Sequence, residues 1–293
     1  MVPYDEFGLF EDNAREVGLP YAGPPIVRRE FVPLADGRRL SGLVWGEGPP
    51  EIVLLHGGAQ NAHTWDTVAL AYDRPLVALD LPSHGHSDAG SNPRLDVMAT
   101  APDIATAIRA LAPDAHAVVG MSLGGLITIA LWVHAPELIR RMVLVDVTPG
   151  VTGPKAKAVT DFVNGPKSFS SFDEILARTI EHNPTRTVSS LRRGILHNAT
   201  QSPDGSWVWR YRRFEDQASR PDLSFLWDVI DTVDVPQLLV RGMRPQSVVD
   251  DADEAELLRR NPGSRVVRVQ DAGHSVQGDQ PVELARILRE FAD

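Results

Sequence analysis

The sequence predicts an α/β protein with a mostly parallel central sheet, covered by helices on both faces, and a helical cap inserted between two late strands. Short apolar runs rich in β-branched residues alternate with longer helical stretches over most of the 293 residues. The runs are apolar without alternation, which is typical of strands buried on both faces of a parallel sheet. This alternation breaks between residues 149 and 233, which indicates an insertion.

The expected strands begin with a pair around the turn at residues 35–37, and six further strands follow. They are expected at 29–34, 38–45, 51–58, 75–82, 115–122, 141–149, 236–242 and 264–274. Helices are predicted where apolar residues recur with helical spacing. These stretches are 62–72, 96–111, 123–134, 251–261 and 281–291.

The composition limits the classes of function. A net charge of -10 argues against nucleic acid or an anionic membrane surface as the main partner, because such binding needs Lys and Arg. The chain has no cysteine, which excludes a disulfide framework and a thiolate nucleophile and agrees with a reducing compartment. The acidic N-terminus has no long apolar run, so neither a signal peptide nor a membrane span is expected. A cytoplasmic protein with a small-molecule substrate is the expectation, and a homodimer is left open.

Three regions are predicted along the chain. Residues 1–25 form an N-terminal extension, residues 26–148 and 234–293 form the core, and residues 149–233 form the cap or lid. The cap lies over the sheet edge where loops gather and a substrate would enter. Four of its side chains are candidates for binding a bulky apolar or aromatic substrate. They are Trp209, Trp207, Phe172 and His182. The alternative is that the aromatic residues form the cap's own core.

The segment GMSLGG at residues 120–125 places a serine between a predicted strand and a predicted helix. It fits the G-x-S-x-G nucleophile elbow, and the bland alternative is a tight turn whose serine caps the helix. LLHGG follows an early strand, ALDLPSHGHSD follows the next, and VQDAGHS lies near the C-terminus. With these motifs in this order, the chain beyond residue 26 resembles the α/β-hydrolase fold superfamily.

The resemblance implies a nucleophile, a base and an oxyanion hole. Ser122 needs an imidazole to accept its proton, and His274 stands in the family's position for that base. The backbone amides of Leu123 and Gly58 are the implied oxyanion donors. His84 and His56 are expected to have structural roles in their loops. No histidine spacing indicates a metal site, and no cofactor is expected.

The carboxylate of the triad is less evident. Most relatives carry it just after the strand at 236–242, where this sequence has Pro245 and Gln246. A second arrangement in the superfamily places the acid at the end of the preceding strand, and here that residue is Asp146. We therefore predict that Asp146 orients His274. Asp250 is the alternative, although its position also suits a helix N-cap.

A serine at the elbow predicts transfer of an acyl group to water through an acyl-enzyme. The expected substrate is an ester or a lactone, whereas relatives that open epoxides or displace halide use a carboxylate nucleophile. Two alternatives stay open. One is a carbon–carbon bond hydrolase that acts on a diketone-type substrate, and the other is a non-catalytic receptor that holds a ligand in the same pocket.

Overall fold

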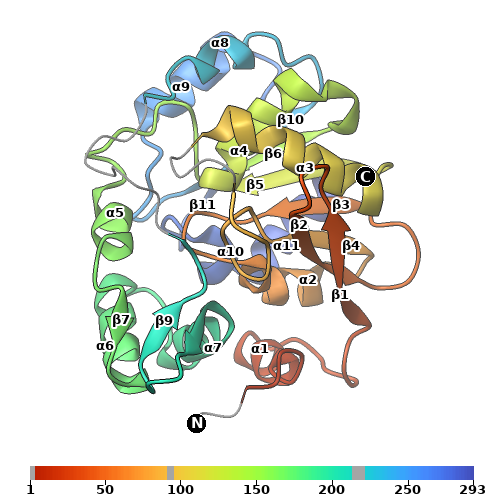
Figure 1. Ribbon diagram of the computed structural model, residues 1–293. Helices are drawn as coiled ribbons and strands as arrows, with labels where there is room; N and C mark the ends of the chain where they lie inside the picture. The colour runs from red at the N-terminus through yellow and green to blue at the C-terminus, as the bar shows by residue number, and fades with distance from the viewer. Residues whose placement is uncertain (1–3, 91–95, 213–221) are drawn as a thin grey trace.

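The computed structural model describes residues 4–90, 96–212 and 222–293. Its centre is an eight-stranded sheet with the strand order β1-β2-β4-β3-β5-β6-β10-β11 (Figure 1). The first two pairings, β1 with β2 and β2 with β4, are antiparallel, and every other neighbouring pair is parallel. The strands are β1 (Val27–Pro33), β2 (Arg39–Trp45), β3 (Ile52–Leu55), β4 (Leu76–Leu79), β5 (Ala117–Met121), β6 (Met142–Val145), β10 (Gln237–Gly242) and β11 (Arg265–Val269). The predicted α/β fold with a mostly parallel sheet is confirmed.

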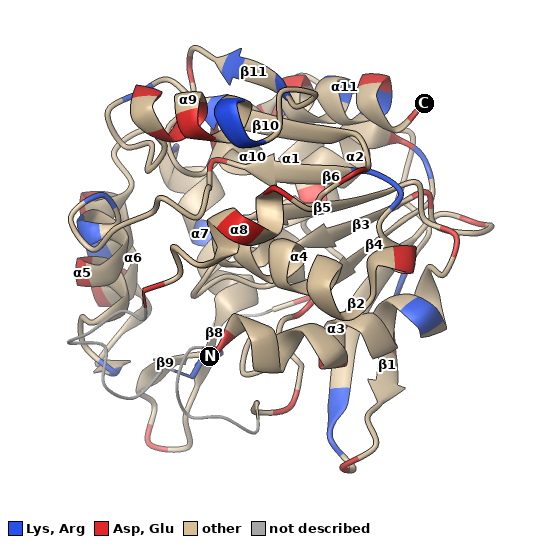
Figure 2. Ribbon diagram, turned by 90° about the horizontal axis from the view of Figure 1, so that it is seen from above, with Lys and Arg blue, Asp and Glu red and all other residues tan. Residues whose placement is uncertain are grey.

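Each central strand is buried on both faces because alternate side chains enter two separate cores. In β3, Val53 and Leu55 join one core, whereas Ile52 and Leu54 join the other. The first core lies under α3 (Val97–Leu111), α4 (Leu123–His134), α8 (Leu226–Ile230) and α9 (Asp251–Arg260). The second lies under α2 (Asp66–Tyr72), α10 (Val276–Asp279) and α11 (Pro281–Ala292). Charged residues gather on the outer surfaces of the helices and on the loops, and the central strands carry almost none (Figure 2).

The predicted helices begin and end close to the expected residues. Asp96 caps α3 by accepting a hydrogen bond from the backbone N–H of Ala99 at 2.9 Å. The stretch predicted at 62–72 starts with a short 3-10 helix, η1 (Ala62–Trp65), and continues as α2. A second 3-10 helix, η2 (Pro136–Leu138), follows α4. No helix in the described part of the chain is long and apolar enough to cross a membrane.

The inserted segment contains strands as well as helices. Its helices are α5 (Lys157–Val163), α6 (Phe172–His182) and α7 (Val188–Asn198). A small antiparallel sheet adds β7 (Ser168–Phe169), β9 (Trp207–Trp209) and β8 (Ala199–Gln201), in the order β7-β9-β8. Strands of two or three residues are too short to show a period in the sequence. Helix α8 packs on α4 and so belongs to the main core rather than to this inserted sheet.

The N-terminal extension also has a defined place. Helix α1 (Phe10–Glu16) packs on α2, and Phe10 is 1% exposed in the second core. The same helix lies beside α7 of the insertion (Figure 1). Arg193 of α7 donates a hydrogen bond to Asn13 of α1 at 2.6 Å and forms an ion pair with Glu16. The extension therefore joins the insertion to the core.

Candidate active site

Ser122 stands at a sharp turn between β5 and α4. Its φ of 50° and ψ of -117° are strained for a residue with a side chain. The turn is as tight as it is because glycines surround it. A Cβ on Gly120 would lie 2.4 Å from the backbone oxygen of Gly124, and a Cβ on Gly124 would lie 2.3 Å from the backbone oxygen of Leu55. The local sequence therefore lifts the Ser122 side chain out of the sheet.

His274 lies in the loop after β11 and contacts both proposed partners. Its Nε2 is 3.0 Å from the Ser122 hydroxyl oxygen, and its Nδ1 is 2.9 Å from Oδ2 of Asp146. When Nδ1–H donates to the carboxylate, Nε2 is free to accept the serine proton. The structure thus brings Ser122, His274 and Asp146 together in the order that proton transfer requires.

Asp146 is fully buried at the end of β6 and has a φ of 47°. Its Oδ1 accepts hydrogen bonds from the Gly242 N–H at 2.9 Å and the Ser247 hydroxyl at 2.6 Å. Its Oδ2 accepts from the Val248 N–H at 3.1 Å as well as from His274. Three donors besides the imidazole thus fix the carboxylate. The Ser247 hydroxyl was not predicted, although it lies in the stretch where most relatives carry the acid.

Asp250, the alternative acid, has another role. Its side chain accepts a hydrogen bond from the N–H of Asp253 at 2.9 Å and caps α9. It also forms an ion pair with Lys155 at 2.8 Å. The carboxylate beside the imidazole is therefore that of Asp146.

Gly58 and Leu123, the predicted oxyanion donors, lie next to each other. A Cβ on Gly58 would be 3.9 Å from Cδ2 of Leu123, and one on the preceding Gly57 would be 3.2 Å from Cβ of Ser122. Among the described residues, neither Gly58 nor Leu123 uses its backbone N–H in a hydrogen bond. Two unused N–H groups beside the serine are what a developing oxyanion needs.

Two buried histidines hydrogen-bond to the loop at residues 56–61, which contains Gly58 and is called the Gly58 loop. His56 donates from Nδ1 to the Gly57 carbonyl at 2.7 Å and accepts the Leu81 N–H at Nε2 at 3.0 Å. Burial, together with the neighbouring His84, lowers the pKa of His56 to about 3. His84 accepts the Ala59 N–H at 3.1 Å, and burial lowers its pKa as well. Both rings are neutral and hold the loop through hydrogen bonds to its backbone, in keeping with the structural role predicted for them.

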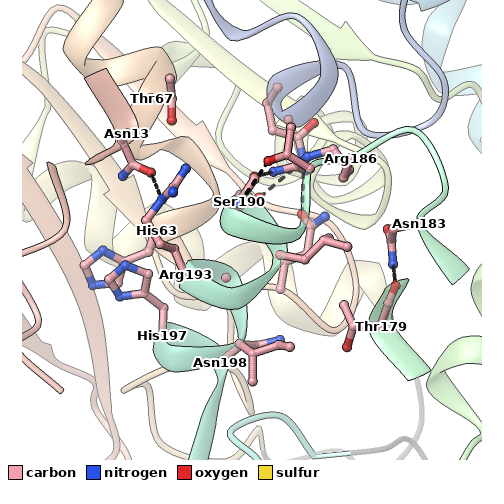
Figure 3. A pocket seen from close by; sticks show the side chains of 18 of the residues that line it. Asn13, His63, Thr67, Thr179, Asn183, Arg186, Ser190, Arg193, His197 and Asn198 are labelled. Carbon is pink, nitrogen blue, oxygen red and sulfur yellow. Dashed lines mark hydrogen bonds between the residues drawn. The ribbon is translucent and has the colours of Figure 1, made fainter. Parts of the chain in front are cut away.

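The four proposed substrate-binding residues do not share one environment. Trp209 lines a cavity of about 370 Å³ between the insertion and the core, some of whose side chains Figure 3 labels. Phe172 and Trp207 instead pack edge to face, with ring centroids 5.2 Å apart, in the insertion's own core. His182 turns its Nδ1 toward the Arg178 carbonyl at 3.1 Å. None of these last three, and neither Ser122 nor His274, is among the described residues that line the cavity.

Comparison with known proteins identifies the family. The model of the alpha/beta hydrolase family matches residues 52–287, from β3 into α11. The chain belongs to the alpha/beta hydrolase family. The predicted resemblance is therefore confirmed.

The chain is similar in sequence and in structure to several known hydrolases. Esterase Rv0045c of Mycobacterium tuberculosis is 42% identical over 303 residues, covering 99% of this chain and 96% of that protein. A structure of that esterase, from work on its inhibition by transition metals, superimposes with a TM-score of 0.86 at 41% identity and covers 99% of both chains. The 3-hydroxybutyrate-oligomer hydrolase of Cupriavidus necator is 27% identical over 82% of this chain and 88% of its own.

A more distant solved structure shares the fold alone. E-2-(acetamidomethylene)succinate hydrolase has a TM-score of 0.77 at 23% identity, with 91% of this chain and 99% of the other covered. The N-terminal extension falls inside the match to the mycobacterial esterase, which covers nearly all of this hydrolase.

Proposed function

We propose that this hydrolase is a serine esterase that acts through Ser122, His274 and Asp146. The observation that carries the proposal is the chain of contacts from serine to imidazole to buried carboxylate, at 3.0 Å and 2.9 Å. The esterase name of the 42% identical relative supports the same reaction class. A serine that only capped a helix would need no imidazole, and Ser122 makes no capping hydrogen bond with α4.

In the proposed mechanism the reaction has two half-reactions. The Ser122 oxygen attacks the ester carbonyl carbon while His274 Nε2 takes the serine proton. Asp146 stabilises the imidazolium that forms, and the N–H groups of Gly58 and Leu123 face the oxyanion. When the carbon–oxygen bond to the alcohol breaks, His274 returns its proton to the leaving alcohol and the acyl group stays on Ser122. A water then attacks the acyl-enzyme with His274 as base, which releases the acid and the free serine.

We propose a bulky apolar or aromatic ester as the substrate class. Trp209 supports it, because this ring is only partly buried and stacks on Tyr211 with ring centroids 5.6 Å apart. Phe172 and Trp207 lend it less support, since their rings are used in packing. Many of the other cavity-lining side chains are polar, among them Asn183, Arg186 and Arg193. Among the described residues, Ser122 and His274 do not line this cavity, so its polar side chains do not define the substrate site at the serine.

A substrate panel tests this proposal and separates the alternatives. The panel contains nitrophenyl esters of increasing chain length, aromatic esters, lactones and one vinylogous diketone. We expect ester turnover to exceed lactone and diketone turnover, and Ser122→Ala to abolish it. Preference for the diketone would favour carbon–carbon hydrolysis. Absence of turnover throughout the panel, with tight binding of one compound, would favour the receptor alternative.

The cytoplasmic location and the homodimer stay predictions.

A further inference from the structure

A second cluster of titratable side chains lies outside the triad. It consists of His63 of η1, Asp66 at the start of α2 and His197 of α7, whose side chains are 2%, 3% and 4% exposed. Their potential ligand atoms all lie within 4.8 Å of one another. The two imidazole rings stack with centroids 3.8 Å apart and planes inclined by 12° (Figure 3).

Two buried atoms of this cluster have no hydrogen-bond partner among the residues that the structure describes. They are Oδ1 of Asp66 and Nε2 of His197. Burying a carboxylate oxygen and a ring nitrogen without a partner is costly and rare. Nε2 of His197 lies 3.7 Å from Oδ2 of Asp66, too far for a hydrogen bond but close enough for both atoms to contact one ion. The unpartnered Oδ1 of Asp66 and Nε2 of His197 therefore leave a polar atom of each residue available to a ligand at this cluster.

The distances suit a small metal ion. Two ligand atoms, each about 2.05 Å from a tetrahedral ion, lie about 3.3 Å apart. Nδ1 of His63 is 2.9 Å from Oδ2 of Asp66, so that this pair must open by a few tenths of an ångström, while the 3.7 Å pair must close by as much. The ion would replace the hydrogen bond between His63 and Asp66. Because an imidazole nitrogen binds a metal through a lone pair in the ring plane, the two nearly parallel rings would have to rotate out of their stack to direct both nitrogens at one ion.

The surroundings supply orientation, charge and access. The Tyr4 hydroxyl lies 2.9 Å from Nδ1 of His197, so this nitrogen can donate to it and leave Nε2 as the ligand atom. Glu6 adds a carboxylate 3.1 Å from Nε2 of His63. Arg29, 3.3 Å from the same nitrogen, opposes a cation, but its charge is shared with Glu6 and Asp80. His63 and His197 also line the cavity of about 370 Å³, which offers a path for the ion and room for a water ligand.

We propose that His63, Asp66 and His197 form a binding site for one transition-metal dication, of which Zn²⁺ and Co²⁺ are suitable probes. Imidazole nitrogens with one carboxylate suit these ions, whereas Ca²⁺ and Mg²⁺ prefer more oxygen ligands. The sequence alone predicted no metal site, because His197 is far from the other two in the chain. His63 and Asp66 stand three residues apart, a spacing that does not by itself indicate a metal site.

Such an ion would tie the insertion to the core. His197 belongs to α7, whereas His63 and Asp66 belong to η1 and α2. The neighbouring Asn198 already donates to the Ala59 carbonyl at 2.7 Å, one residue after Gly58. The ion would reinforce this contact without using any residue of the triad.

The full-length protein, stripped with a chelator, is titrated with Zn²⁺ by calorimetry and with Co²⁺ by visible absorption. We expect one ion per chain, the intense bands of four-coordinate Co²⁺ and an unfolding midpoint that rises with metal concentration. Removing a residue that only hydrogen-bonds a metal ligand lowers metal affinity by about 10- to 100-fold. His197→Ala and Asp66→Asn each remove a direct ligand, so each should weaken binding by at least about 100-fold.

Two matched controls should keep wild-type affinity. His134→Ala removes an exposed histidine, and His274→Ala removes the triad imidazole. The proposal is overturned if wild-type protein shows no saturable site, if its Co²⁺ spectrum is that of a six-coordinate surface ion, or if His274→Ala rather than His197→Ala abolishes binding. The wild-type spectrum decides even if a cluster variant fails to fold.

Discussion

Replacing Asp146 by asparagine tests the assignment of the triad acid. The carboxylate accepts from Gly242 and Ser247 at Oδ1 and from Val248 and His274 at Oδ2. An amide group at the Oδ2 position would face two N–H donors. At the Oδ1 position it faces only the Gly242 N–H, because the Ser247 hydroxyl can rotate and accept from it.

In Asp146→Asn, the orientation with the amide nitrogen at the Oδ1 position should therefore predominate. It leaves the buried Gly242 N–H unsatisfied, which should lower the free energy of unfolding by about 1–3 kcal/mol. The imidazolium loses its charged partner, an interaction of about 3 kcal/mol, so kcat should fall by at least about 100-fold. Loss of the correct tautomer would extend the fall to about 10 000-fold, the size known for a serine protease.

The assays are ester turnover and urea unfolding of Asp146→Asn beside Asp250→Asn. Asparagine caps a helix nearly as well as aspartate, and the Asp250 side chain is half exposed, so this control should lose less than about 1 kcal/mol and keep its turnover. Turnover of Asp146→Asn within about threefold of wild type, or inactive Asp250→Asn, would refute the reasoning.

Three further predictions concern the base, the elbow and the buried histidines. His274→Ala should lower kcat about as much as Ser122→Ala, and the double variant should be little worse, because the two act as a unit; an additive loss in steady-state assays would contradict this. Gly124→Ala should cost about 3 kcal/mol in urea unfolding, because its Cβ would overlap a backbone oxygen of β3; wild-type stability would show that the elbow tolerates a side chain. Stability should fall as the pH drops below about 6.5, by about 1.4 kcal/mol per unit for His56 alone, since the unfolded chain binds protons there while the folded ring, with a pKa of about 3, does not. His84 acts in the same direction, and unfolding free energies that stay constant between pH 7 and 5 would contradict this.

The strands of the sheet and the turn at Ser122 could be predicted from the sequence because both depend on local patterns of residues. Apolar runs bounded by turns predicted β3, β5 and β6, and the glycines around Ser122 predicted a turn that side chains would block. The choice of Asp146 depended on the absence of a carboxylate at Pro245 and Gln246, an inference that the contact with His274 now supports.

Contacts between distant segments could not be read from the sequence. The hydrogen bond from the Ser247 hydroxyl to Asp146 joins residues 101 positions apart in the chain. His197 lies near Asp66 only because α7 packs against η1. The inserted strands were missed because two or three residues show no period. The rings of Phe172 and Trp207 were expected at a substrate, but an insertion this small needs them for its own core.

Covalent labelling of the nucleophile tests the central claim most directly. Wild-type protein is treated with a fluorophosphonate, and its intact mass and the modified peptide are measured. We expect one adduct per chain on Ser122, none in Ser122→Ala, and much slower labelling in His274→Ala, because the serine oxygen reacts only when the imidazole accepts its proton. Unlabelled wild-type protein, or an adduct on another residue, would contradict the assignment of Ser122 as the activated nucleophile.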